Sequence, residues 1–233
     1  MPAHSGKETV PRHEPAGIHE PGAANGYTVV LPAGWRRIPA RHGTDTAIKG
    51  ILDEVFGRLS KNLPRDKVYP YRVDFERRLS GMVADARKKA ALDLYLPVEY
   101  IHGMPVPASF IVSQGPLGGA ESLDPAQILA FLVADKDNAS AIEVDGAMGV
   151  RTEHTAPPDR LADIKVGSRR VDYVLAVPGA ADQWLMIAFS TLGSGDPDGE
   201  FAKVLVELFD AIMSTFRWTR EEAERQENGA AND

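Results

Sequence analysis

The chain contains no cysteine, and this absence rules out several kinds of site at once. Without a thiol there can be no disulfide, no zinc–thiolate centre and no cysteine nucleophile. Long hydrophobic runs are also missing, since no stretch approaches the roughly 20 apolar residues that span a bilayer. The segment Met1–Glu8 lacks the apolar core of a signal peptide. These absences predict a cytoplasmic protein without an integral membrane segment.

Positive charge is in deficit along the chain. The sequence carries 26 lysines and arginines against 33 aspartates and glutamates, which gives a formal net charge of −7. Binding to nucleic acid depends on clustered basic residues that neutralise phosphates. The charge balance therefore predicts no nucleic-acid partner, and it argues equally against an anionic membrane surface. The bias of arginine over lysine and the abundant alanine are common in high-GC bacteria, and they favour a bacterial source.

The standard catalytic motifs are missing as well. The sequence has no GxSxG nucleophile elbow, no GxxxxGK[ST] phosphate loop, no GxGxxG fingerprint and no HExxH pair. The glycine-rich segment Gly115–Gly119 has no lysine, and the six histidines show no metal-ligand spacing. We therefore expect no catalytic residue, no metal site and no cofactor. The missing motifs favour a protein that is not an enzyme, but they do not decide whether it is one.

The composition that is present is typical of one globular domain. Apolar residues make up 43% of the chain and charged residues 25%, which is enough apolar material for a proper core. Residues 1–26 are rich in Pro, Gly, His and Glu and lack periodicity, which predicts a disordered tail. We expect a single α/β domain at 27–218, followed by a polar C-terminal tail at 219–233.

Periodicity within the domain predicts four helices and seven strands. The helices are expected at 44–59, at about 71–90, from the Asp124–Pro125 cap to about 135, and from the Asp196–Pro197 cap to Phe216. The last of these gives the clearest apolar face. Strands are predicted at Tyr27–Leu31, Leu92–Leu96, Ser109–Ser113, Ala141–Asp145, Ala147–Thr155, Ser168–Val177 and Trp184–Thr191.

The order of these elements predicts the fold class. Four of the strands form consecutive hairpins, so the sheet should be mainly antiparallel. The strand Trp184–Thr191 is apolar on both faces, which indicates that helices cover it on both sides. The sequence therefore predicts an α+β fold, an α/β/α sandwich whose mainly antiparallel sheet has helices on both faces.

Three segments also carry a family resemblance. They are "YTVVLPAGWRRIP" near the start, "IEVDGAMGVRTEH" in the middle and "QWLMIAFSTLG…FAKVLVELFDAIMSTFRW" near the end. In this order they resemble the PsbP-like superfamily, which includes the extrinsic photosystem II subunit, a Ran-binding nuclear import factor and bacterial proteins of unassigned role. The resemblance covers 27–218 in order of elements. It implies a binding or assembly module, and it brings no active-site motif that could be carried over.

Basic residues inside the domain are the first candidates for an interaction surface. Arg36, Arg37 and Arg41 follow the first strand and could form a site for an anion or an acidic protein. The alternative is a solvated face that pairs with the many acids. Arg151 lies inside a predicted strand, and its side chain should point to the same side as that of Glu153. It is either a pocket arginine or a member of an ion pair.

Two further residues complete the candidate surface. His102 lies in a proline-rich loop, 97–107, where it is either functional or simply solvated. Trp218 follows the last helix, next to Arg217. If exposed, it would suit an interface anchor; otherwise it closes the edge of the core.

These observations leave three functional hypotheses. The first is a non-catalytic protein-interaction module, an adaptor, chaperone or assembly factor. It would bind a protein partner or itself through a sheet edge or the loop 97–107. The second is an enzyme or small-molecule binder with an unrecognised pocket, in which Arg151, His102 or His154 converge and carry a shifted pKa. The third and weaker one is a structural component of a secretion or phage-like machine.

Overall fold

Antiparallel pairing organises the sheet of this protein. The computed structural model describes residues 23–59, 65–100, 103–117, 124–134, 138–158, 166–180, 182–191 and 196–220. Within these ranges the strands build a seven-stranded sheet of order β2-β3-β4-β8-β7-β6-β5, and β1 pairs with β9 in a separate ribbon. Every pairing is antiparallel. The predicted α+β class with a mainly antiparallel sheet is therefore confirmed.

The elements follow the chain with short connections. The strands are β1 (Ala24–Thr28), β2 (Trp35–Pro39), β3 (Ala91–Pro97), β4 (Ala108–Gly115), β5 (Ala139–Val144), β6 (Ala147–Ala156), β7 (Ser168–Ala176), β8 (Trp184–Thr191) and β9 (Arg217–Arg220). The helices are α1 (Thr44–Leu59), α2 (Arg65–Lys88), α3 (Pro125–Ala134) and α4 (Glu200–Ser214). Ribbon strands β1 and β9 include residues 24–26 and 219–220, which the sequence analysis assigned to the tails.

The tightest hairpin joins β5 and β6. Its turn consists of Asp145 and Gly146, which have φ values of 48° and 77°. Both residues have positive φ, as a two-residue type I′ turn requires, and Asp–Gly is a preferred pair there. The turn fixes the register in which Val144 faces Ala147. The Asp–Gly pair alone was therefore enough to predict this hairpin from the sequence.

One face of the sheet is covered by α4. Phe209 lies at the centre of this contact with 1% of its surface exposed. Its ring stacks on Phe189 of β8 with centroids 4.7 Å apart, and it meets Tyr173 of β7 edge-on at 5.6 Å. The apolar face predicted for this helix does bury, because Leu205 and Met213 join the same core cluster. This aromatic cluster attaches α4 to the middle of the sheet.

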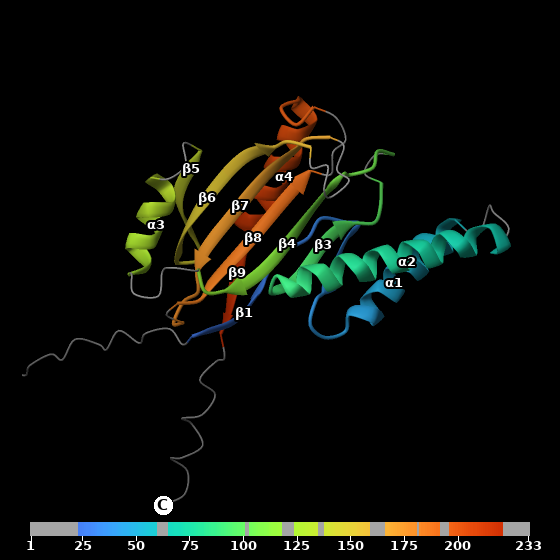
Figure 1. Cartoon of the computed structure of the whole chain (residues 1–233), viewed down its shortest axis with the longest axis horizontal. Coiled ribbons are helices and arrows are strands. Elements are labelled where there is room, and N and C mark those ends of the chain that lie inside the picture. The colour runs from blue at the N-terminus through green and yellow to red at the C-terminus, as the bar shows by residue number, and fades with distance from the viewer. Residues whose placement is uncertain are drawn as a thin grey trace, which may run out of the picture.

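The opposite face is covered only at its two ends. Helices α1 and α2 contact β2 and β3, and α3 contacts β5 and β6. Figure 1 shows β4, β8 and β7 lying open between α2 and α3, with α4 behind them. Met186 on β8 is half-buried and Ala188 is exposed, although Trp184 of the same strand is buried near α3. The expectation that both faces of this strand are covered is wrong for its central part.

Two strands and two helix starts differ from the sequence prediction. The strands β2 and β9 are short and were not predicted. Helix α2 begins at Arg65, six residues before the expected start, and so contains Pro70. Val68 packs into the α1–α2 cluster with 8% exposed, and this burial offsets the backbone bond that Pro70 cannot make. Helix α4 begins at Glu200, with Gly199 as N-cap, so Asp196–Pro197 forms the preceding turn and not the cap.

Candidate functional site

The uncovered part of the sheet forms a groove of about 340 Å³ between α2 and α3. Its floor consists of the outward side chains of β7 and β8, chiefly Val174, Met186 and Ala188. Leu132 of α3 closes one side, and Lys89 at the end of α2 closes the other. The groove is therefore an apolar surface between two helices, and α4 covers the reverse of its floor.

Helix α2 carries further exposed apolar side chains outside the lining of the groove. Tyr71, Phe75 and Met82 are 74%, 40% and 53% exposed, and their spacing places them on one face of the helix. Leu79 and Val83 of the same helix are buried, whereas Phe75 and Met82 are not. The apolar stripe of α2 is wider than its contact with the rest of the protein.

The groove lining also includes the polar residues Lys89, Ser113, Thr152, Asp172 and Tyr173, and one of their hydroxyls lacks a partner among the described residues. Thr152 on β6 is 6% exposed, and its Oγ1 has no hydrogen-bond partner among the described residues. A buried hydroxyl without a partner is destabilising by about 1–3 kcal/mol relative to a satisfied one. Lys89 brings positive charge to the α2 side and Asp172 brings negative charge to the floor. An occupant would therefore meet a positive charge on the α2 side of the groove.

A second hollow, of about 450 Å³, lies between the β1–β9 ribbon and the α4-facing side of the sheet. Tyr27 and Trp218 come from the ribbon, and Arg37 and Asp93 come from β2 and β3. Arg41, in the loop between β2 and α1, lies at the same hollow. Three of the predicted site residues, Arg37, Arg41 and Trp218, therefore line one hollow, although they are far apart in the sequence.

A buried carboxylate holds this hollow together. Asp93 is 2% exposed and uses both of its oxygens within the protein. Arg37 Nε donates to its Oδ1 at 2.6 Å, and the Tyr27 hydroxyl donates to its Oδ2 at 2.5 Å. The hydroxyls of Tyr27 and Tyr95 are 3.0 Å apart. This cluster attaches the ribbon to the sheet, and it leaves Asp93 no free oxygen for a ligand.

The protonation states of Tyr27, Tyr95 and Arg37 are fixed around neutral pH. Burial, with the nearby Tyr95 and Asp93, raises the pKa of Tyr27 far above its ordinary value. Burial likewise raises the pKa of Tyr95 to about 12. The hydrogen bond to Asp93 raises the pKa of Arg37. General acid–base catalysis works best when a pKa lies near the working pH. These three shifts move the pKa values further above neutral pH. The cluster is therefore suited to binding and support, not to proton transfer.

Arg36 lies on the other face of β2 from Arg37. Its Nε and Nη2 donate to both carboxylate oxygens of Glu54 on α1, at 2.9 and 2.6 Å. Arg58 and Glu99 complete this network, in which Arg36 and Glu99 are 3.7 Å apart. The alternation of a strand separates the adjacent arginines, so Arg36, Arg37 and Arg41 do not form one basic patch.

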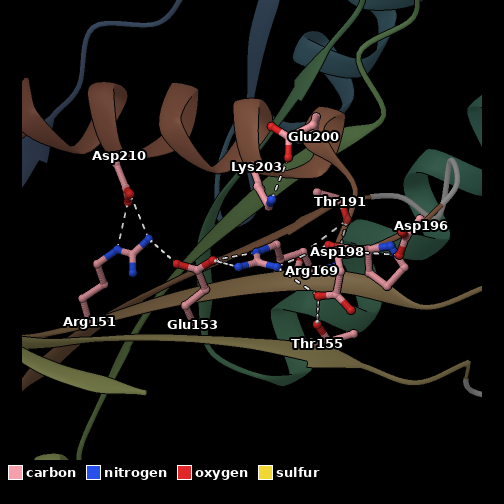
Figure 2. A network of polar contacts seen from close by, with 11 residues as sticks. Arg151, Glu153, Thr155, Arg169, Thr191, Asp196, Asp198, Glu200, Lys203 and Asp210 are labelled. Carbon is pink, nitrogen blue, oxygen red and sulfur yellow. Dashed lines mark hydrogen bonds and ion pairs between the residues drawn. The ribbon is translucent and has the colours of Figure 1, made fainter. Parts of the chain in front are cut away.

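Arg151 belongs to a row of ion pairs between β6, β7 and α4. It donates to Asp210 of α4 through two nitrogens, at 3.1 and 2.8 Å, and to Glu153 at 2.8 Å. Glu153 also accepts from Arg169 at 2.6 Å, and Arg169 reaches Asp198 at 3.1 Å (Figure 2). The side chains of Arg151 and Glu153 do point to the same side, as the strand period predicted. The cations here are saturated by carboxylates, which leaves Arg151 as an ion-pair residue.

The convergence expected for a catalytic pocket is wrong for two of its three residues. Arg151 faces α4, whereas His154 lies on the opposite face of β6, three residues further on, with its Nδ1 3.9 Å from Asp172. An odd spacing along a strand places two side chains on opposite faces. His102 lies outside the described residues. Trp218 is 7% exposed and meets Phe216 edge-on at 5.0 Å, so it is not the exposed anchor considered above.

We expect Glu153→Gln to lower the free energy of unfolding by about 1–3 kcal/mol at pH 7, because two arginines lose a shared charged acceptor. Burial alone would raise the pKa of Glu153, but hydrogen bonds from Arg151 and Arg169 outweigh it and hold the pKa below its ordinary value. A lowered carboxyl pKa stabilises the fold above the unfolded pKa, about 4.3, and that stabilisation is lost as pH falls through the folded value.

Urea unfolding of both proteins between about pH 3 and pH 7 checks this expectation, since the m-value and midpoint yield the difference at each pH. The difference should shrink towards the acid end. Glu207→Gln, at an exposed position of α4, is the matched control and should not change the profile. A difference that is constant with pH would contradict the ionic account of the network.

The described ranges contain neither a metal-ligand cluster nor a membrane-spanning helix. No group of three or more His, Asp or Glu side chains is placed there to hold a metal ion. None of the helices in these ranges is both long and apolar enough to cross a membrane.

Comparison with known proteins gives structural likenesses but no family. No family model matches the chain, and the search of curated proteins finds no match. Among solved structures, the chain is similar to the crystal structure of LpqN, described as involved in cell envelope biogenesis of Mycobacterium tuberculosis. The two share 12% identity at a TM-score of 0.47, over 90% of this chain and 93% of that chain. No residue role is transferred from it.

More residues of the hollow than of the groove could be identified as candidates from the sequence. The arginines and the tryptophan of the hollow were visible as candidates, but Tyr27, Asp93 and His42 were not. Asp93 interrupts an apolar strand, "LDLYL", and this single charge was the available signal. Nothing local in the sequence shows that α2 and α3 stop short of each other.

Proposed function

We propose that this chain is a non-catalytic binding module that receives an amphipathic helix of a partner protein in the groove between α2 and α3. The observation that carries the proposal is the open central face of a sheet whose other face is covered. Helix-in-groove recognition is a common way in which proteins bind apolar helix faces. The resemblance to PsbP-like binding and assembly modules agrees with this class. An adaptor, chaperone or assembly factor in a bacterial cytoplasm remains our proposed setting.

The width of the groove favours one helix as the occupant. Helix α2 contacts β3 and α3 contacts β6, and four strand spacings separate β3 from β6 across β4, β8 and β7. At about 4.8 Å per spacing, this corresponds to about 19 Å. Packed helices lie about 8–10 Å apart, so two such steps span about 16–20 Å. One further helix therefore fits between α2 and α3 without moving either.

The chemistry of the walls specifies the kind of helix. Its lower face should be apolar to pack on Val174, Met186 and Ala188. An acidic residue on the flank next to α2 would meet Lys89. We therefore propose the sheet face as the docking surface, and docking through a sheet edge or the loop 97–107 stays an untested prediction.

Site-specific photo-crosslinking in the native host tests the proposal. A benzoylphenylalanine at Ala188, on the floor of the groove, should crosslink to one partner, and mass spectrometry should map the adduct to an amphipathic helical segment. Ser140, exposed on the α4 side of β5, is the matched control position and should give little adduct. A second change, Ser113→Lys, introduces a charged chain into the groove at a polar position. It should lower the adduct yield at least about fivefold, the order expected when a charge is left in an apolar contact.

Several outcomes would contradict the proposal. They are equal yields from Ala188 and Ser140, adducts that map to non-helical segments, no adduct at Ala188, or adducts only to a second copy of this chain. Ser140→Lys provides the control for the lysine change and should leave the yield at Ala188 unaltered. Circular dichroism of each variant shows that the fold is retained.

A further inference from the structure

The hollow between the β1–β9 ribbon and the sheet supports an inference that is independent of the groove. It lies on the α4 side of the sheet, and its volume of about 450 Å³ is within the range of small-molecule sites. The partner helix proposed above would lie on the opposite face. The two surfaces can therefore be tested separately.

Hydrogen-bond donors outnumber free acceptors around the hollow. Arg37 uses its Nε on Asp93, but its side chain is 57% exposed, and no bond is made by its two terminal nitrogens within the described residues. Arg41 and His42 are exposed and line the hollow, and neither has an ion-pair partner in the described ranges. The carboxylate of Asp93 is saturated from inside the protein. The hollow thus offers cationic donors to a ligand and no free carboxylate.

A buried donor provides a second, independent indication. Trp218 lines the hollow, is 7% exposed, and its Nε1 has no hydrogen-bond partner among the described residues. Indole nitrogens that are buried usually find an acceptor. The hydrogen bonds in the described residues do not supply one here. An acceptor brought by a ligand would complete this arrangement.

Part of the remaining wall is aromatic and aliphatic, beside the polar Asn25, Gln114 and Thr219. The Tyr27 ring stacks on Phe216 with centroids 5.5 Å apart and planes inclined by 5°. Leu92 and Leu185 contribute aliphatic surface to the same hollow. Because Arg37 is balanced by Asp93, the local excess of positive charge comes from Arg41. That excess contrasts with the net charge of −7 for the whole chain.

We propose that this hollow binds a small organic anion in which an oxyacid group, carboxylate or phosphate, is attached to a flat apolar body. Arg41 and the outer nitrogens of Arg37 hold the oxyacid group, as arginine does bidentately elsewhere. The flat body lies against the Tyr27 and Trp218 side of the hollow. This is a binding role in which no bond of the ligand is broken.

Nuclear magnetic resonance of the full chain provides the test, with benzoate and phenyl phosphate as probes. The chain has three tryptophans, and Trp218→Phe identifies which indole N–H resonance belongs to Trp218. Titration of either anion should shift that resonance saturably, whereas the neutral benzyl alcohol should not. The tighter of the two anions tells a carboxylate ligand from a phosphate ligand.

Arginine variants test whether the positive charge that binds the anion is the one in the hollow. Arg41→Ala should weaken the binding of the preferred anion about tenfold, the order of a charge-assisted hydrogen bond to a partly solvated group. Arg77→Ala, on the exposed surface of α2, is the matched control and should leave the affinity unchanged. The proposal is overturned by no saturable shift up to about 10 mM anion, beyond which affinity is negligible. Equal binding of benzyl alcohol, or equal losses in the two arginine variants, would overturn it as well.

Discussion

Phe209→Ala is expected to lower the free energy of unfolding by about 3–5 kcal/mol, which is the usual effect of removing a fully buried phenylalanine. The ring is 1% exposed, and it contacts Phe189, Tyr173 and Phe110 at the centre of the core. No neighbouring side chain is free to fill the space, because each is held in the sheet. Since whole domains are stable by only about 5–15 kcal/mol, this one change removes a large share of the total.

Chemical denaturation followed by far-ultraviolet circular dichroism measures this effect. Phe201→Ala is the matched control, because Phe201 lies on the same helix but is 43% exposed. Its loss should be below about 1 kcal/mol, as for exposed positions generally. If the two substitutions had similar effects, α4 would not be attached to the sheet through Phe209.

Asp93→Ala should have the second largest effect, a loss of about 3 kcal/mol. Removing one partner of a buried charge pair typically costs about 3–5 kcal/mol, and the lower end applies here because Arg37 can be rehydrated. The change also leaves the Tyr27 hydroxyl without its acceptor. Because Tyr27 belongs to β1, we expect the ribbon to loosen more than the sheet does.

Hydrogen exchange measured by mass spectrometry separates the local effect from the global one. Protection should fall in β1 and β9 under conditions where β7 and β8 remain protected. Asp85→Ala, at an exposed acid of α2 that pairs with Lys88, is the control and should leave exchange in the ribbon unchanged. Uniform loss of protection across the sheet would show that Asp93 does not act as the attachment point of the ribbon. The hollow should lose its anion affinity in Asp93→Ala but not in Asp85→Ala.

The groove and the hollow lie on opposite faces of one sheet, and we propose a different occupant for each. On one face, α1, α2 and α3 leave a strip of floor wide enough for one helix. On the other, α4 covers the centre and the β1–β9 ribbon encloses a basic hollow at the end. Figure 1 shows the ribbon beside the lower end of β4 and β8, separate from the helices that flank the groove. Failure of the crosslinking experiment would therefore not bear on the anion titration, and the reverse also holds.

Local sequence determined those elements that carry a strong turn, cap or periodicity signal. The Asp145–Gly146 turn specified a hairpin, because its backbone requires positive φ at both positions. Asp124 before Pro125 specified the start of α3, and Asp124 Oδ1 does accept from the Ala126 N–H at 3.0 Å. The long apolar face of α4 indicated a helix against the sheet. These signals act over a few residues, and tertiary contacts did not override them.

Tertiary structure decided what depends on the placement of distant segments. The ribbon pairs Tyr27 with Trp218, residues from the two ends of the domain, and no local pattern contains that register. Arg36 and Arg37 look alike in sequence, but α1 supplies Glu54 to one and β3 supplies Asp93 to the other. The open floor of the groove depends on where α2 and α3 end. Periodicity reports which face of an element is apolar, whereas packing alone determines what covers it.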